Sequence, residues 1–213
     1  MPDKFASLLF DSPLINNVKN WDRLVFTKIN EDWTNSFFDT IFPLWREAMT
    51  WVPLYIFLAL FIFINFGIKA WPWAFAMILT VTLTDQVSSH LVKPFIDRPR
   101  PCHDPLLTDH IRLLLQYCSN SKSFTSSHAT NHFGVAFFIY RTMKPYFGKW
   151  GYLFFLWAAS VSYGQVYIGV HYPVDVIGGA LLGSAIGYTT STLFNKKIGT
   201  PPLRHQQKTV ATV

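Results

Sequence analysis

Residues 51–67 have the sequence WVPLYIFLALFIFINFG, an almost purely apolar run that ends just before Lys69. The run contains no charged residue and is close to the minimum length of a helix that crosses a bilayer. It therefore predicts a membrane-spanning helix. Four later apolar segments predict four more spanning helices, at about 71–93, 125–140, 150–167 and 173–194.

The composition supports this interpretation. Half of the 213 residues are hydrophobic, only 14% are charged, and the mean hydropathy is +0.22. Such a chain is too apolar for an ordinary soluble domain, and many of its aromatic residues lie at the ends of apolar runs, where headgroups are expected. The net charge of +6 is divided among loops and termini without a single basic patch. We therefore expect an all-α integral membrane helix bundle that contacts anionic lipid and binds no nucleic acid.

The chain divides into three predicted regions. Residues 1–50 interleave aromatic and charged side chains and predict amphipathic helices in the membrane interface, with a cytosolic cap as the alternative. Residues 51–195 predict one transmembrane domain. Residues 196–213 predict a polar, disordered cytoplasmic tail. The first twenty residues lack the continuous apolar core of a cleavable signal peptide.

Basic residues next to the helices predict the orientation, because they favour the cytoplasmic side. In a five-helix topology the N-terminal region, the loop 94–125 and His171 then share the outer face of the inner (cytoplasmic) membrane. The outer loop is itself basic, which is an exception to this rule. The exception is explained if these charges bind a ligand. The basic residues expected on the cytoplasmic side are Lys69, Arg141, Lys144, Lys149, Lys196, Lys197, Arg204 and Lys208.

In the fifth predicted helix, Gly179, Gly183 and Gly187 recur every four residues. This spacing leaves one stripe of the helix without side chains and allows a neighbouring helix to approach closely. We expect this helix to pack at the centre of the bundle.

Three polar groups converge on the predicted outer face: KPFIDRPRP at 93–101, TSSH at 125–128, and GQVYIGVHYPVD at 164–175. Lys and Arg are suited to holding a phosphate. Ser126 and Ser127 are candidates for the N-cap of a helix whose free N–H groups would add an anion-binding surface. Two histidines beside a phosphate permit one to attack phosphorus and the other to protonate the leaving oxygen.

These motifs resemble those of the type 2 phosphatidic acid phosphatase (PAP2) superfamily, the lipid phosphate phosphatases. Lys93, six intervening residues, Arg100 and Pro101 match its first signature, TSSH is similar to its P-S-G-H element, and GVHYPVD resembles the end of its S-R-x5-H-x3-D element. The resemblance covers about residues 85–190 and implies a metal-independent phosphatase without a cofactor.

The resemblance also implies roles for individual residues. His171 would be the nucleophile that forms a phospho-histidine, Asp175 would orient it, and His128 would be the general acid. Lys93 and Arg100 would hold the phosphate oxygens, and Ser126 and the backbone around Ser127 would complete the site.

The sequence departs from the family pattern in two places. Thr125 and Ser127 replace Pro and Gly in the second motif, and Gly164 and Gln165 stand where the third motif has Ser and Arg. Gln165 can donate one hydrogen bond to a phosphate oxygen but brings no charge, which could cost roughly 1.5–3 kcal/mol. We hypothesise that Arg98 partly compensates as an auxiliary phosphate ligand.

His128 and His132 are spaced like a metal-binding pair, but no third ligand with suitable spacing follows, so we expect no metal and a packing or hydrogen-bonding role for His132. Cys102 and Cys118 both fall in the predicted outer loop. There they would form a disulfide in an oxidising compartment; two free thiols are the alternative.

The sequence thus predicts a membrane enzyme that removes a terminal phosphate from a lipid phosphate or diphosphate. Undecaprenyl diphosphate is the first expectation for its substrate. Phosphatidylglycerophosphate, phosphatidic acid and lipid A are the alternatives within the class. A poorly active relative that only binds lipid phosphate is an alternative of a different class.

Overall fold

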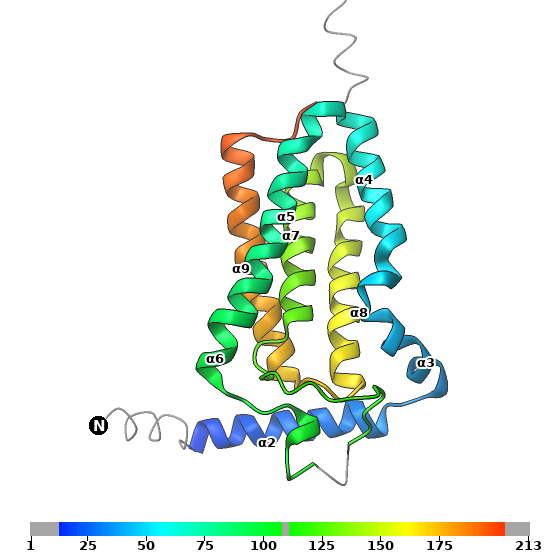
Figure 1. Cartoon of the computed structure of the whole chain (residues 1–213), viewed down its shortest axis with the longest axis vertical. Coiled ribbons are helices and arrows are strands. Elements are labelled where there is room, and N and C mark those ends of the chain that lie inside the picture. The colour runs from blue at the N-terminus through cyan, green and yellow to red at the C-terminus, as the bar shows by residue number, and fades with distance from the viewer. Residues whose placement is uncertain (1–12, 108–110, 203–213) are drawn as a thin grey trace, which may run out of the picture.

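The computed structural model describes residues 13–107 and 111–202, and the predicted disordered tail falls mostly outside this range. The fold is an integral membrane helix bundle, as predicted. Five long helices stand side by side, and α2 lies across one end of them (Figure 1). The helices are α2 (Pro13–Thr27), α3 (Ser36–Trp45), α4 (Val52–Phe66), α5 (Trp71–Gln86), α6 (Lys93–Ile96), α7 (Ser127–Phe147), α8 (Leu153–Tyr167) and α9 (Pro173–Lys197).

The predicted spanning helices agree with the observed ones apart from their ends. A π-helical turn, Val87–Val92, joins α5 to α6, so the second predicted helix continues as far as Ile96. The third begins as predicted but extends beyond residue 140 to Phe147, where Gly148 ends it with a φ of 51°. By length and composition, two helical stretches of the described residues could cross a membrane: Ala48–His103, which contains α4, α5 and α6, and Pro173–Lys197.

Helix α7 forms the centre of the bundle. Its side chains Phe138, Ile139 and Met143 are buried against α4, α5 and α9. The outer faces of α4, α5 and α9 carry exposed apolar side chains, as expected for surfaces that contact lipid tails. Examples are Ile56, Phe57, Leu60, Ile64, Phe75, Ile78, Leu79, Ile177, Leu181 and Leu193.

The predicted glycine stripe lies at the interface between α9 and α7. A Cβ atom at Gly183 would overlap the carbonyl oxygen of Thr130, and one at Gly187 would overlap that of Gly134. The two backbones therefore approach more closely than any side chain on this stripe would allow. This contact fixes the start of α7 beside the start of α9, which are the two helix ends that carry the second and third sequence motifs.

Helix α2 has an inner polar contact and an outer apolar stripe. Asp22 and Phe26 are buried against the bundle, whereas Leu14, Trp21 and Leu24 are exposed on the outside. An exposed apolar stripe on a helix across the bundle end is the pattern of helices that insert into a membrane interface. The long connection between α6 and α7 crosses the same end (Figure 1).

Candidate active site

The three polar motifs meet at the end of the bundle that α2 crosses. They line one cavity of about 340 Å³, together with Arg46, which directly follows α3, and residues of the loop between α6 and α7. Ser127, His128 and His171 contribute to its wall beside two predicted cations, Lys93 and Arg100. The other lining residues are Arg46, Ser89, Leu115, Tyr117, Ser119, Ser121 and Val170.

His171 lies in the short turn between α8 and α9. Gly169 has a φ of 90° there, and a Cβ atom at this position would press on the carbonyl oxygen of Arg112. The backbone N–H of His171 donates to the carbonyl of Gln165, 3.2 Å away, so the turn folds back on the last turn of α8. The side chain of His171 is buried, with 3% of its surface exposed, and it forms part of the cavity wall.

The two ring nitrogens of His171 face different partners. Nδ1 is 3.3 Å from Ser123 Oγ and 3.6 Å from Asp175 Oδ2, and the Ser123 hydroxyl donates its proton to Asp175 Oδ2. Because that proton is already used, Ser123 can only accept from Nδ1, which must then carry the hydrogen. On the other side, Nε2 lies 3.2 Å from Arg100 Nη1.

Arginine can only donate hydrogen bonds, so the Arg100 contact also requires an unprotonated Nε2. Burial is the main cause that lowers the pKa of His171 to about 4, and the Arg100 and Lys93 charges add to it against the influence of Asp175. At neutral pH the imidazole is therefore uncharged. Its unprotonated Nε2 is on the ring edge beside Arg100, and this neutral tautomer is the form that a nucleophilic histidine requires.

Asp175 is held by several donors at the first turn of α9. The N–H of Tyr172 donates to its Oδ2 at 2.9 Å, in a capping arrangement that fixes the carboxylate at the helix start. Arg98 Nη1 donates to Oδ1 at 2.8 Å. The other end of the Arg98 guanidinium binds Asp22 of α2, whose second oxygen accepts from the N–H of Val174.

Arg98 is therefore located behind the Asp175 carboxylate and does not line the cavity. Our hypothesis that it is an auxiliary phosphate ligand is not supported by this position. Its guanidinium also lies 4.0 Å from the ring centre of Tyr172. This arrangement instead makes Arg98 a support for the carboxylate that orients His171.

Lys93 and Arg100 are held by backbone and hydroxyl oxygens. Lys93 Nζ donates to the carbonyl of Lys122 at 3.0 Å, and Arg100 donates to the carbonyl and hydroxyl of Ser121 at 2.9 and 2.8 Å. Arg100 Nη1 also donates to the carbonyl of Val170 at 3.0 Å. These contacts direct both cations into the cavity without neutralising them with a carboxylate.

The second motif forms the N-terminus of α7. Ser126 is the N-cap, and its hydroxyl accepts from the N–H of Ala129 at 3.5 Å. The Ser126 N–H donates to the carbonyl of Asp175, which ties the starts of α7 and α9 together. Ser126 is fully buried and does not line the cavity, whereas Ser127 and His128 of the next turn do.

His132 has a structural environment. Its Nδ1 lies 2.8 Å from the carbonyl oxygen of His128, and its ring packs against Trp157 at 4.6 Å between centres. The rings of His128 and His132 are stacked with centres 6.3 Å apart. The packing and hydrogen-bonding role expected of His132 agrees with these contacts.

Gln165 is fully buried in α8 and lies outside the cavity wall. Its amide nitrogen donates to the carbonyl of Val161 in its own helix at 3.4 Å. The expectation that Gln165 contacts phosphate is not supported by this position. Its backbone carbonyl instead holds the turn that carries His171.

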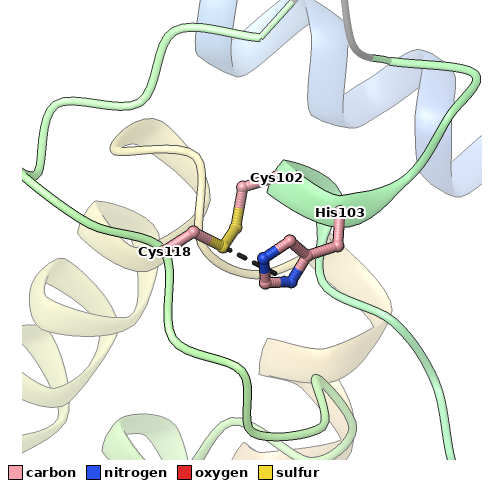
Figure 2. A group of neighbouring side chains, drawn as sticks. All are labelled: Cys102, His103 and Cys118. Atoms are coloured by element: carbon pink, nitrogen blue, oxygen red, sulfur yellow. Dashed lines mark hydrogen bonds between the residues drawn. A yellow bond between two sulfur atoms is a disulfide. The ribbon is translucent and has the colours of Figure 1, made fainter.

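A disulfide joins Cys102 to Cys118 across the loop between α6 and α7, with their Cα atoms 6.2 Å apart (Figure 2). His103 points toward this bond, with Nδ1 3.7 Å from Cys118 Sγ. These three side chains are spaced closely enough for a metal site, but sulfurs joined in a disulfide offer no thiolate ligand. The disulfide instead links the segment that carries Arg100 to the segment that carries Ser121.

Several residues of this site were not predicted from the sequence. Among them, Ser123 bridges His171 and Asp175, Asp22 binds the far side of Arg98, and Arg46, which directly follows α3, lines the cavity. Each comes from a loop or an N-terminal helix without a recognisable local motif. The signal available was the unusual number of charges between aromatic residues in residues 21–50.

One end of this helical membrane bundle brings together two histidines, a carboxylate and cations. This combination is typical of membrane proteins that act on phosphate groups. Residues 69–198 match the model of the PAP2 superfamily, and the chain belongs to this superfamily. The match includes all three motifs. The resemblance inferred from the sequence is therefore confirmed.

Individual relatives are similar over most of this chain. A lipid A 4'-phosphatase of Porphyromonas gingivalis is 33% identical over 153 residues, which cover 70% of this chain and 63% of that relative. The phosphatidylglycerophosphatase B of Bacillus subtilis is 28% identical over 59% of this chain and 60% of its own length. This chain thus spans less than two thirds of the length of either relative.

Solved structures agree with the fold. The crystal structure of Aquifex aeolicus LpxE matches with a TM-score of 0.55 and 28% identity, over 79% of this chain and 93% of that one. A phosphatidylglycerolphosphate phosphatase of Bacillus subtilis matches with a TM-score of 0.59 over 90% of this chain and 91% of that chain. Its identity is 20%, so this second match supports the fold alone.

Proposed function

We propose that this chain is a membrane lipid phosphatase that works through a phospho-histidine at His171. The observation that carries the proposal is the hydrogen bonding of His171, in which Nδ1 is occupied by Ser123 and the unprotonated Nε2 lies beside Arg100. A buried, neutral and oriented imidazole beside fixed cations is suited to attack phosphorus.

In the proposed reaction, Nε2 of His171 forms a bond to phosphorus while the bond from phosphorus to the lipid oxygen breaks. His128 donates a proton to that oxygen. Water then attacks the phosphorus, the bond to Nε2 breaks, and His128 accepts the proton that the water loses. Lys93 and Arg100 stabilise the phosphoryl oxygens throughout, because positioning and charge stabilisation are the main requirements of phosphoryl transfer.

A lipid A phosphate becomes the leading substrate, ahead of undecaprenyl diphosphate. The change rests on the relatives, since two lipid A 4'-phosphatases align with 70% and 71% of this chain. The similarity to an undecaprenyl-diphosphatase of Sulfolobus acidocaldarius covers only 15% of it. Phosphatidylglycerophosphate and phosphatidic acid are the other candidates.

We further propose that the protein resides in the inner (cytoplasmic) membrane with its site on the outer side. The support is the distribution of basic residues: Lys69 joins α4 to α5, and Lys144 and Lys197 end α7 and α9, at the helix ends away from the cavity. Such residues favour the cytoplasmic side.

The test is phosphate release by the purified full chain in detergent from lipid A, phosphatidylglycerophosphate, phosphatidic acid and undecaprenyl diphosphate. We expect hydrolysis of at least one lipid, with lipid A preferred, and no turnover by His171→Ala. A phosphorylated protein that His171→Ala does not form would support the intermediate. Binding of these lipids without any hydrolysis would favour a binding protein and contradict the enzyme proposal.

A further inference from the structure

Arg46 follows the last residue of α3 and reaches the cavity from an element that carries none of the three motifs. Its side chain is mostly buried, with 19% exposed. The buried Nε has no hydrogen-bond partner, and the guanidinium has one weak ionic contact, 3.6 Å from the exposed carboxylate of Glu47. Burying a charged donor without a partner is unfavourable, so Arg46 retains capacity to bind an anion.

Three other described arginines at this end of the bundle are paired with carboxylates, whereas Arg100 is held by backbone and hydroxyl oxygens and lines the same cavity. Arg23 binds Asp104, Arg98 binds Asp22 and Asp175, and Arg112 forms a two-pronged pair with Asp39. Each pair neutralises the guanidinium. Arg46 thus differs from these three because it lines the cavity and its ion pair within the described residues is with the exposed Glu47.

Arg46 and Arg100 contribute positive charge to the same cavity. Burial is the main cause that lowers the pKa of Arg100, and the charge of Arg46 contributes in the same direction. Arginine nevertheless stays protonated in proteins, so the two guanidinium groups that line this cavity repel each other. A phosphate dianion between them would remove this repulsion.

The packing of α3 explains how Arg46 arrives there. The ring of Phe42 lies so close to Gly164 that a Cβ atom on this residue would be 2.9 Å from Phe42 Cδ1. One turn earlier in α8, the Ser160 hydroxyl accepts a hydrogen bond from Trp45 Nε1 at 2.9 Å. Helix α3 therefore packs against the part of α8 that carries Gly164 and Gln165. Arg46 directly follows Trp45, so this packing fixes its position.

The packing of α3 on α8 accounts for both departures of the third motif, Gly164 and Gln165. A serine in place of Gly164 would press on the Phe42 ring, and Gln165 is turned away into α8 with its own amide bonded to Val161. We propose that Arg46 is a ligand of the substrate phosphate and supplies, from α3, the positive charge that Gln165 lacks. This inference rests on the proposed phosphatase function.

The experiment compares purified wild-type protein with Arg46→Gln, Arg46→Lys and Arg46→Ala, using the lipid that the wild-type protein hydrolyses best. Losing a hydrogen-bonded charge predicts that Arg46→Gln lowers kcat/KM about 10- to 100-fold. Arg46→Lys should retain more activity than Arg46→Gln. Added methylguanidine should restore activity to Arg46→Ala, which a purely structural role would not permit. The matched control is Arg141→Gln, which removes a partly buried arginine at the opposite end and should leave kcat/KM unchanged.

A second measurement does not depend on turnover or on variants that fold. Phenylglyoxal modifies accessible arginines, and inorganic phosphate or orthovanadate should slow its reaction with Arg46 in the wild-type protein, as read by mass spectrometry. Two results would overturn the inference while leaving the phosphatase function intact. One is an Arg46→Gln variant that keeps at least half of the wild-type kcat/KM. The other is a rate of Arg46 modification that phosphate and orthovanadate leave unchanged. A wild-type protein that hydrolyses no lipid would overturn the proposed function, and the protection measurement would still decide the role of Arg46.

Discussion

Arg100 Nη1 lies 3.2 Å from Nε2 of His171, while the opposite ring nitrogen lies 3.3 Å from Ser123 Oγ. The two contacts impose the same tautomer from opposite sides, because Arg100 cannot accept a proton and Ser123 has given its own to Asp175. The nucleophile proposed here is therefore oriented before any substrate binds. Preorganisation of this kind reduces the cost of reaching the transition state.

Ser123→Ala should impair catalysis more than binding. The variant leaves the Nδ1–H of His171 and an oxygen of Asp175 with one partner fewer in a buried site, which costs about 1–3 kcal/mol. We expect kcat to fall roughly 10- to 100-fold with a small change in KM. Ser123→Thr keeps the hydroxyl and should retain more activity, and Ser191→Ala, a buried serine farther along α9, is the matched control. Equal activities of Ser123→Ala and wild type would contradict the bridging role.

The stability of the protein should depend on pH through His171. Its pKa is about 4 in the folded protein and about 6.5 when unfolded, so between these values the unfolded chain binds the additional proton. Stability should therefore rise with pH from about 4 to 6.5 and then level off. Thermal unfolding in detergent across this range measures the slope. His171→Gln removes the titrating group, and a variant with the same slope as wild type would show that other groups cause it.

The sequence alone predicted the spanning helices, the glycine contact and the motif residues that line the cavity. These features depend on local patterns: apolar runs, a four-residue repeat, and short motifs at helix starts. It did not predict the partners that complete the site. Ser123 contacts His171, Arg46 lines the cavity, and Asp22 binds Arg98 and Val174. These contacts join segments up to 152 residues apart, as in the bond between Asp22 and Val174. The partners of Arg98 were not predicted for the same reason, because its two carboxylates lie on different helices, α2 and α9.

Arg98→Gln should destabilise the protein. The guanidinium lies between Asp22 and Asp175, which are 1% and 0% exposed in their side chains. Removing one member of a buried ionic group leaves uncompensated charge and costs about 3 kcal/mol or more. We expect a clear fall in the unfolding temperature. Adding Asp22→Asn removes one of the two stranded charges and keeps an acceptor for Val174, so the double variant should be more stable than Arg98→Gln alone. A double variant with additive loss would contradict the coupling of these charges.

Removing the disulfide should loosen the segment that holds Arg100. The bond joins cysteines 16 positions apart, and closing a loop of that size stabilises a protein by roughly 3 kcal/mol in the chain-entropy model. Arg100 lies two residues before Cys102, and its partner Ser121 lies three residues after Cys118. We therefore expect Cys102→Ser with Cys118→Ser to lower the unfolding temperature and to raise KM, since the cation and its support can separate. Treating wild type with a reducing agent should reproduce both effects, and the same agent should leave the double variant unchanged. A double variant with wild-type unfolding temperature and KM would show that the loop keeps its conformation without the covalent link.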